Sequence, residues 1–424
     1  MLILTASFCS YGDSHNHKDP MGSVILFISI ILLTAKMGGD IATRLNQPAV
    51  LGELLAGVVL GNLHFFGFHG FEPMKTDTSI DMLARLGVIV LLFEAGLEST
   101  VGQMLKVGGT SFIVATIGVL TPFILGWVLS SWLLPEANHY VHTFLGATLT
   151  ATSVGITARV LKDLNRSQSI EARIILGAAV IDDILGLILL AVISGVILAA
   201  NAGGSISYVG VGWTFVKAAL FLFGSVFLGV YLSPRLFSLA SKLRARGVLL
   251  AIGLSFCFIL AWLSNLIGLA PIVGAFAAGL ILEEVHYKDF VYQGEHRLEE
   301  LINPITSFLV PIFFVLMGMH TDLSTFSQGN VVGLALGLTV VGIIGKVCSG
   351  LGVVSKGIDK LSIGLGMVPR GEVGLIFANM GLALFVKGEP IITRATFSAL
   401  VVMVILTTFI TPPALKWSMN RRRR

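Results

Sequence analysis

Two adjacent acidic residues, Asp182 and Asp183, lie in the middle of the apolar stretch LGAAVIDDILGLILLAV. A charge at the centre of a membrane helix costs on the order of 2.5–3.5 kcal/mol on insertion scales, and such residues usually serve a function. Two carboxylates in a medium of low dielectric cannot both stay charged without compensation. A bound cation or a proton supplies that compensation, so the acidic pair is a candidate ion and proton site.

A lysine in another apolar stretch can neutralise one of the two acids. Lys346 lies in LTVVGIIGKVCSGLGVV. Successive residues on a helix point about 100° apart, so the two carboxylates need not share one partner. One can face the lysine on a neighbouring helix while the other faces a water-filled cavity. The alternative is a buried ion-pair network that only locks helices together.

Two apolar stretches also contain residues that weaken a helix. The first, LTATSVGITARV, is rich in hydroxyl side chains, which compete with helical hydrogen bonds: Thr150, Thr152 and Ser153. In the second, Met367–Gly374, Pro369 lacks an N–H donor, and Gly371 and Gly374 loosen the turn. A pair of interrupted helices in corresponding halves is the best sequence indication of a transporter's binding site. A proline kink with packed hydroxyls is the alternative.

The composition requires that membrane helices carry these residues. Of the 424 residues, 55% are hydrophobic and 12% are charged, whereas soluble domains have about 25% charged residues. A helix needs about 20 apolar residues to cross the hydrocarbon core. The sequence therefore predicts an all-α polytopic membrane protein with thirteen spans, at about residues 22–43, 49–67, 80–98, 109–133, 141–161, 171–200, 208–236, 247–265, 268–283, 303–320, 330–355, 360–386 and 392–417.

Little of the chain lies outside these spans. We expect residues 1–20 to be a polar extracytoplasmic tail without a signal peptide, and residues 21–424 to be a single membrane transporter domain. The three cysteines are far apart in the sequence, which disfavours a zinc site or a disulfide, and we expect no cofactor. The net charge of +4 reflects membrane topology and does not indicate nucleic-acid binding.

The basic residues predict the orientation. Of the 28 lysines and arginines, 20 fall on one set of loops, six on the other set and two inside spans. Because basic residues concentrate in cytoplasmic loops, the N-terminus is expected outside and the C-terminus in the cytoplasm.

An internal repeat has an offset of 222 residues. Gly52, Gly57 and Gly96 correspond to glycines in the second half of the chain: Gly274, Gly279 and Gly318. The two copies are separated by an odd number of spans and so cross the membrane in opposite directions. Inverted repeats of this kind build many secondary transporters.

The chain resembles bacterial sodium/proton antiporters of the second cation/proton antiporter family, most closely the thirteen-helix electrogenic, NapA-like type. The segments that carry the resemblance are VIDDILG with its paired aspartates, TATSVGI and PRGEVGLI as unwound helices, and GKVCSG with its lysine. The resemblance covers essentially the whole chain.

The resemblance assigns roles to the site residues. It implies that Asp183 is the main ion and proton carrier and that Asp182 pairs with Lys346. A transient Na⁺ would be held by the two aspartates, with two hydroxyl residues flanking it: Thr152 and Ser153.

The resemblance also implies an architecture. Arg370 and Glu372 would stabilise the second broken helix. The domain would consist of three parts. The dimerisation part would comprise about residues 22–98 and 247–320, the core part about residues 109–200 and 330–417, and the linker helix about residues 208–236.

Together these features predict an electrogenic antiporter that exchanges Na⁺ or Li⁺ for H⁺ by an elevator-type movement. We expect a homodimer in the bacterial cytoplasmic (inner) membrane, serving cation and pH homeostasis. A K⁺/H⁺ antiporter of the same fold is the nearest alternative. An intramembrane aspartyl protease is disfavoured, because its two aspartates face each other across a cleft. A channel is disfavoured because an exposed pore does not explain a buried lysine.

Overall fold

The computed structural model describes residues 20–45, 47–98, 108–164, 166, 169–201, 208–240, 242–243, 245, 247–282, 296–327, 329–355, 357–386 and 388–421. The expected N-terminal tail therefore lies outside the described residues, except for Pro20, which begins the first helix.

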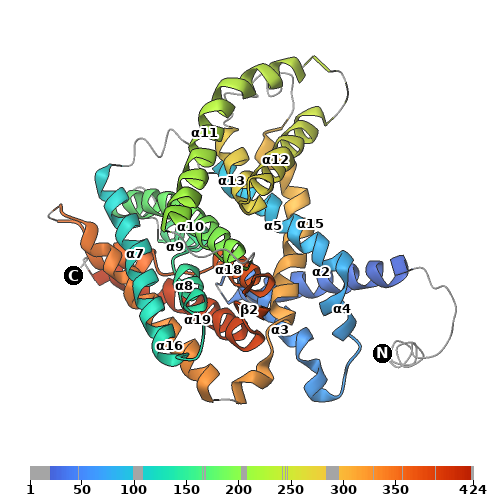
Figure 1. Cartoon of the computed structure of the whole chain (residues 1–424), viewed down its shortest axis with the longest axis vertical. Coiled ribbons are helices and arrows are strands. Elements are labelled where there is room, and N and C mark those ends of the chain that lie inside the picture. The colour runs from blue at the N-terminus through green and yellow to red at the C-terminus, as the bar shows by residue number, and fades with distance from the viewer. Residues whose placement is uncertain are drawn as a thin grey trace. The chain divides into compact units, whose positions relative to one another are not determined.

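The described residues are mostly helical, and the helices follow one another in two similar series (Figure 1). The first series is α2 (Pro20–Arg44), α3 (Ala49–Gly61), α5 (Thr78–Glu98), α7 (Gly109–Leu133), α8 (His139–Thr148), α9 (Val154–Asp163) and α10 (Ile170–Asn201). The helix α11 (Tyr208–Ala240) comes between the series. The second series is α12 (Val248–Leu266), α13 (Pro271–Ile281), α15 (Leu298–Met319), α16 (Gly329–Val347), α17 (Lys360–Gly366), α18 (Glu372–Ala383) and α19 (Arg394–Arg421).

Short elements complete the list. They are η1 (Leu63–Phe66), α4 (Glu72–Thr76), η2 (Leu323–Ser327), η3 (Cys348–Gly352) and the two strands β1 (Phe385–Val386) and β2 (Glu389–Pro390), which pair antiparallel.

Each predicted span coincides with a helix or with a broken pair of helices. Seven of the described helices are long and apolar enough to cross a membrane, and shorter apolar helices accompany them. The all-α prediction is confirmed, while the count of thirteen membrane crossings stays a prediction. Several helix ends differ from the predicted span ends, and two of these differences shorten a span. The second span continues past Gly61 only as η1, and the twelfth ends at Ala383, before the β1–β2 hairpin.

Each broken pair begins with a capped half-helix. The side chain of Asn138 accepts a hydrogen bond from the backbone N–H of Tyr140 at the start of α8. Asp359 accepts from the N–H groups of Leu361 and Ser362 at the start of α17. Such caps satisfy N–H groups that have no partner within the helix, which defines where each half-helix starts.

The chain divides into two compact units, Met1–Gly87 with Ser307–Asp322 and Val88–Thr306 with Leu323–Arg424. The predicted division into dimerisation, core and linker parts concerns function and stays a prediction.

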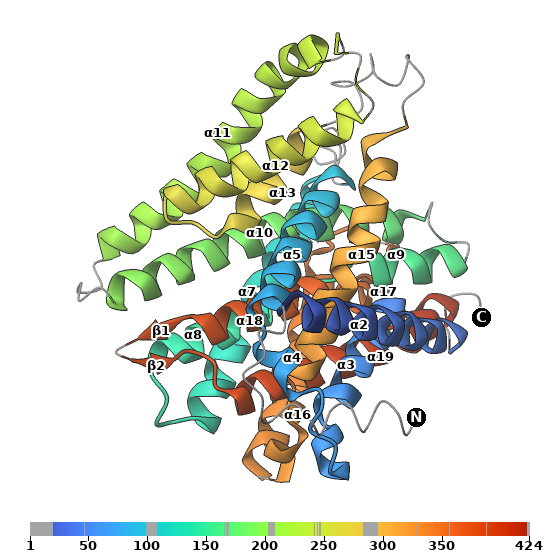
Figure 2. The same cartoon turned by 90° about the vertical axis from the view of Figure 1, so that its right-hand side faces the viewer.

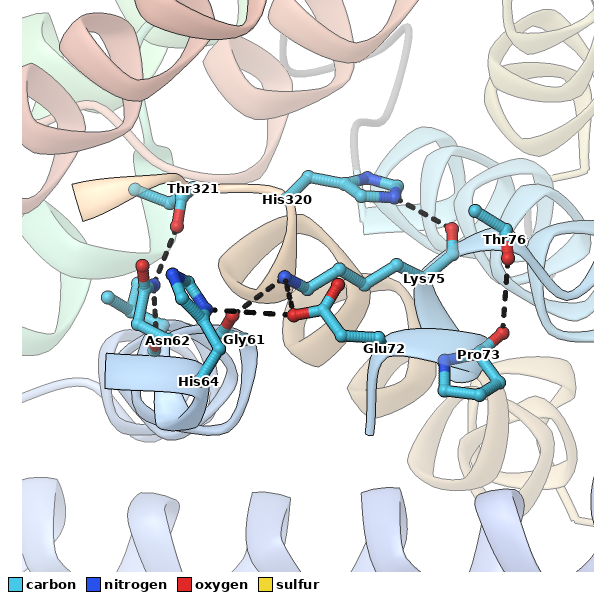
Figure 3. Close-up of polar contacts among 10 residues, drawn as sticks. Gly61, Asn62, His64, Glu72, Pro73, Lys75, Thr76, His320 and Thr321 are labelled. Carbon is cyan, nitrogen blue, oxygen red and sulfur yellow. Dashed lines mark hydrogen bonds and ion pairs between the residues drawn. The ribbon is translucent and has the colours of Figure 1, made fainter. Parts of the chain in front are cut away.

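Within the first unit, the segment after α3 is tied to the end of α15 (Figure 3). Lys75 donates from Nζ to the carbonyl of Gly61 over 2.7 Å, and its own carbonyl lies 3.1 Å from Nε2 of His320. Asn62 donates from Nδ2 to the carbonyl of Thr321 over 2.7 Å. These contacts join residues far apart in the sequence at one end of the unit.

Within the second unit, α7 contacts α8, α10 and α16, and α16 contacts α19 (Figure 1, Figure 2). In the same unit α13 packs against α11 and α12. The halves of both broken helices adjoin this group, since α9, α17 and α18 contact α19, and the group carries the acidic pair on α10 and the buried lysine on α16.

Glycine contacts confirm the internal repeat. In the first unit, a Cβ added to Gly318 would lie 2.8 Å from Cα of Gly57. In the second unit, a Cβ added to Gly96 would lie 3.0 Å from Cα of Gly279. The 222-residue offset relates Gly57 of α3 to Gly279 of α13, and Gly96 of α5 to Gly318 of α15. The contact between α3 and α15 therefore corresponds to the contact between α13 and α5. The same backbone approach therefore occurs once in each half of the repeat, at positions too close for any side chain.

Candidate functional site

The first helix break lies between α8 and α9. After α8 ends at Thr148, residues 151–153 have no regular secondary structure and are buried. The hydroxyl of Thr150 donates to the carbonyl of Ala147, three residues earlier in the chain, over 2.8 Å. This is the local competition with the helix that the hydroxyl-rich stretch predicted.

The second break lies between α17 and α18 and is shorter than predicted. The helix stops at Gly366 and resumes at Glu372, so Gly374 lies inside α18 and outside the break. Pro369 lacks a donor, whereas Gly374 keeps its N–H and has room for packing, since an added Cβ would lie 3.7 Å from Val404. The helix break around Pro369 therefore does not extend to Gly374.

The two breaks cross each other. The backbone N–H of Ser153 donates to the carbonyl of Pro369 over 2.8 Å. The hydroxyl of Thr152 donates to the carbonyl of Met367 over 3.3 Å. The 222-residue offset relates Thr152 to Gly374, which lies inside α18, whereas the hydrogen-bond partner of Thr152 is Met367 at the start of the break.

Each break satisfies carbonyl groups of the other. Thr157 in α9 donates its hydroxyl to the carbonyl of Gly366, the last residue of α17, over 2.6 Å. In return, Nη1 of Arg370 donates to the carbonyl of Ala151 just after α8. A membrane interior has no water to satisfy such carbonyls, so the partners must come from the protein. The crossing is thus held by reciprocal capping.

Arg370 ties further elements to the crossing. Its side chain is fully buried, and Nη2 donates to the carbonyl of Gly342 in α16 over 3.4 Å. Its own carbonyl accepts a hydrogen bond from the hydroxyl of Thr408 in α19. One residue therefore joins the α8–α9 break to α16 and α19.

A buried ion pair lies in the same helix group. Nζ of Lys346 is 2.8 Å from Oδ1 and 3.0 Å from Oδ2 of Asp182, and both side chains are fully buried. The Thr152 hydroxyl is a further polar neighbour of this carboxylate, and Arg370 acts on it electrostatically. The pair therefore couples α10 to α16 beside the crossing.

Two glycines make room for this pair. A Cβ on Gly345 would lie 2.7 Å from Cα of Pro122, so α7 and α16 approach closely one residue before Lys346. A Cβ on Gly118 in α7 would lie 3.7 Å from Nζ of Lys346 and 3.8 Å from Oδ1 of Asp182. The bare backbone of Gly118 therefore forms one wall beside the ion pair.

Three predicted site residues remain to be placed: Asp183, Ser153 and Glu372. Asp183 follows Asp182 in α10 and is only partly buried, and its carboxylate acts electrostatically on Lys346. A Cβ on Gly371 would lie 2.7 Å from Oγ of Ser153, so that position admits only glycine without a shift. The side chain of Glu372 lies outside the described part of the chain.

Several residues of the site carry no clear sequence signal. Thr157 could have been found as a hydroxyl one turn beyond the first break. Thr408 lies 38 residues from its partner Arg370, and Gly118 is one of 48 glycines, so nothing in their local sequence marks them.

Nearly the whole chain is similar to known membrane antiporters. The family model described as "Sodium/hydrogen exchanger, transmembrane" matches residues 28–421. The chain is similar to the high-affinity Na(+)/H(+) antiporter NhaS3 of Synechocystis, at 39% identity over 93% of this chain and 90% of that protein. It is also similar to the Na(+)/H(+)-K(+) antiporter GerN of Bacillus cereus, at 36% identity over 93% of this chain and 96% of GerN.

A solved structure has the same fold. The sodium proton antiporter MjNhaP1 of Methanocaldococcus jannaschii matches with a TM-score of 0.67 and 17% sequence identity, over 95% of this chain and 97% of that one. The predicted antiporter fold, with its two crossing broken helices, is thereby confirmed.

Proposed function

This chain belongs to the sodium/hydrogen exchanger family and is a membrane cation/proton antiporter, not an enzyme; on that premise we propose that it exchanges Na⁺ for H⁺, with Li⁺ as a second substrate. We propose further that Asp183 carries the ion and the proton, and that the exchange is electrogenic. The observation that carries this proposal is the buried Asp182–Lys346 pair beside the crossing of two broken helices.

The two aspartates differ in a way that supports different roles. Asp182 is sealed, with both carboxylate oxygens against Lys346. Asp183 is less deeply buried than Asp182, although its Oδ1 atom is buried, and this difference supports the approach of an ion to Asp183. Na⁺ takes oxygen ligands, and two hydroxyl residues beside the break could supply them with the carboxylates: Thr152 and Ser153.

Cation and proton then compete for the same carboxylates. When protons are plentiful, Asp183 is protonated and its affinity for a cation is lost. When protons are depleted, its carboxylate is charged and accepts the cation. Exchange follows because one occupant must leave before the other binds.

The ion pair offers a second proton. A cation at Asp183 would draw Asp182 toward it and weaken the contact with Lys346. Without its carboxylate, the buried ammonium is disfavoured by desolvation, so the lysine can release its proton. Two protons against one Na⁺ would move net charge across the membrane.

The proposal extends to the larger movement of the protein and to its assembly. We propose that the core part, at about residues 109–200 and 330–417, moves as an elevator against a dimerisation part that pairs with a second copy. The distribution of lysine and arginine supports an outside N-terminus and a cytoplasmic C-terminus in the bacterial inner membrane. The reciprocal capping of the two breaks supports movement of the core as one body, because its helices are cross-linked.

Potassium is the second candidate ion. The printed name of GerN includes both Na⁺ and K⁺, and a K(+)/H(+) antiporter subunit of Bacillus subtilis, KhtU, is 29% identical over 91% of this chain. The ligand types do not discriminate between the two ions, because both bind oxygen.

The test is purified protein in proteoliposomes that contain a pH-sensitive dye and carry an imposed pH gradient. Addition of Na⁺ or Li⁺ is expected to dissipate the gradient, and K⁺ is expected to do so poorly. A gradient that collapses equally with K⁺ would favour the potassium alternative. No response to any alkali cation would contradict the proposed function.

A further inference from the structure

The buried hydroxyl groups of this chain mostly satisfy themselves. Thr148, Thr339 and Thr407 each donate to a carbonyl four residues earlier in the same helix. Within the described ranges, three buried serine hydroxyls have no hydrogen-bond partner: Ser194, Ser233 and Ser349. Burying a hydroxyl without a partner is costly, so each such group requires an explanation.

Ser349 differs from Ser194 in where it lies. The Cβ position of Gly118 would be 3.3 Å from Cβ of Ser349, 3.7 Å from Nζ of Lys346 and 3.8 Å from Oδ1 of Asp182. Ser349 and the ion pair therefore surround the same point on α7. Ser194 lies twelve residues after Asp182 on α10, which is about 18 Å along the helix axis.

Ser349 and the ion pair lie against the bare backbone of α7, and Ser349 is close to Lys346 in the sequence. Gly118 has no side chain, so α7 places only backbone between Ser349 and the ion pair. Ser349 comes three residues after Lys346, in η3, which continues directly from α16. Its side chain is fully buried, so bulk water does not occupy its hydrogen-bonding positions.

We propose that Ser349 is a positioning residue for ion exchange: its hydroxyl is the second partner of Lys346, which the lysine contacts when Asp182 turns to the bound cation. This inference rests on the proposed function, because it requires that the ion pair opens when the cation binds. The structure shows Lys346 paired with Asp182, and the proposal names the partner of Lys346 in the state in which this pair is open.

A hydroxyl suits this role better than a carboxylate or an apolar side chain. It has one donor and two acceptor lone pairs, whereas a lysine ammonium has donors only. The hydroxyl therefore accepts from the charged ammonium and donates to the neutral amine after the proton has left. An apolar residue would leave the lysine without a partner, and a second acid would hold its proton.

The test compares Ser349→Ala with the matched control Ser194→Ala, which removes another buried hydroxyl without a partner in the described structure. Na⁺-dependent proton movement is measured in proteoliposomes over a range of pH. In Ser349→Ala the apparent KM for Na⁺ is expected to rise about three- to tenfold, because the lysine competes harder for Asp182. The onset of exchange is expected to move to higher pH, where the lysine loses its charge more easily.

Two further variants separate positioning from packing. Ser349→Thr keeps the hydroxyl and should behave like the wild type. In a Lys346→Gln background, Ser349→Ala should change the apparent KM no further, since the two residues act through one contact. Should Ser349→Ala accumulate poorly, Ser349→Cys keeps the volume with a weak hydrogen-bonding group.

The outcomes are distinct. An apparent KM and pH profile of Ser349→Ala that match those of Ser194→Ala would overturn the assignment, as would a full effect of Ser349→Ala without Lys346. A wild-type protein that exchanges no alkali cation would instead contradict the proposed function, and this inference would fall with it.

Discussion

Arg370 donates a hydrogen bond from Nη1 to the main-chain carbonyl of Ala151, which lies 219 residues earlier in the chain. The same guanidinium donates from Nη2 to the carbonyl of Gly342. Because the guanidinium is planar and forked, it can reach two carbonyls in fixed directions, which the single ammonium of a lysine cannot do. The forked shape of the guanidinium therefore lets Arg370 contact the α8–α9 break and α16 at the same time.

Replacement of Arg370 by lysine is expected to lower the free energy of unfolding by about 1–3 kcal/mol, because a buried carbonyl loses its donor. Thermal unfolding of the detergent-solubilised protein measures the change. Arg235→Lys is the control, since Arg235 is exposed on α11 and contacts Tyr231 one turn away. Equal melting temperatures for both variants would show that the crossing does not depend on the guanidinium.

Replacement of Asp183 by asparagine is expected to abolish cation-driven proton movement while the protein still folds and inserts. Asparagine keeps the shape of the side chain but can neither bind a proton nor offer a full negative charge to a cation. Dye-reported exchange in proteoliposomes measures the loss. Asp40→Asn, at an exposed acid that pairs with Arg44, should leave exchange intact. Normal exchange by a well-folded Asp183→Asn protein would remove Asp183 from the carrier role.

Replacement of Lys346 by glutamine is expected to leave exchange but remove its electrogenicity, because glutamine has no proton to release. Transport current on a solid-supported membrane is measured together with dye-reported exchange in the same vesicles. Lys36→Gln serves as control, since Lys36 is exposed and lies 4.0 Å from Glu53. An unchanged current per ion exchanged would show that Lys346 is only structural.

Loss of both signals in Lys346→Gln has a separate meaning, because an unpartnered Asp182 can destabilise the protein. The double variant Asp182→Asn with Lys346→Gln removes both charges and tests this. Recovery of folding without recovery of exchange would show that the pair is needed for transport as well as for stability.

Replacement of Gly279 by alanine is expected to destabilise the protein by about 1–3 kcal/mol, because the added methyl group would overlap the backbone of α5. Gly224→Ala in α11 is the matched control, since nothing lies within 4 Å of its added Cβ. That variant should be stabilised by about 0.5–1 kcal/mol, the difference in helix propensity. Melting temperatures that change in the same direction would contradict the close contact of α13 with α5.

The orientation can be measured by cysteine labelling in a background that lacks Cys9, Cys257 and Cys348. A label at Glu136, in the exposed turn between α7 and α8, should react with an impermeant reagent from outside. A label at Lys242, which is exposed after α11, should react only after the membrane is opened. The opposite accessibility would reverse the predicted orientation.

The sequence by itself determined the class of the protein and the residues that need an explanation. The spans were located as apolar stretches long enough for a helix to cross the bilayer. Such stretches must be helical, because backbone groups in hydrocarbon must be satisfied within a helix. The acids Asp182 and Asp183 and the lysine Lys346 were recognisable because charge is rare in such segments. Pro369 marked the second break, because its missing donor acts locally and is independent of packing.

Only the tertiary structure decided which of these residues meet and where the breaks end. Ser153 binds the carbonyl of Pro369, and Thr157 caps α17, because two half-helices that cross expose carbonyls to each other. Gly374 appeared to belong to the break, yet it lies inside α18, where an added Cβ would lie 3.7 Å from Val404 of α19. The place of Ser349 beside the lysine depends on a glycine of α7 that is more than 200 residues away in sequence. Contacts of this kind are set by how helices pack, and local sequence carries no signal for them.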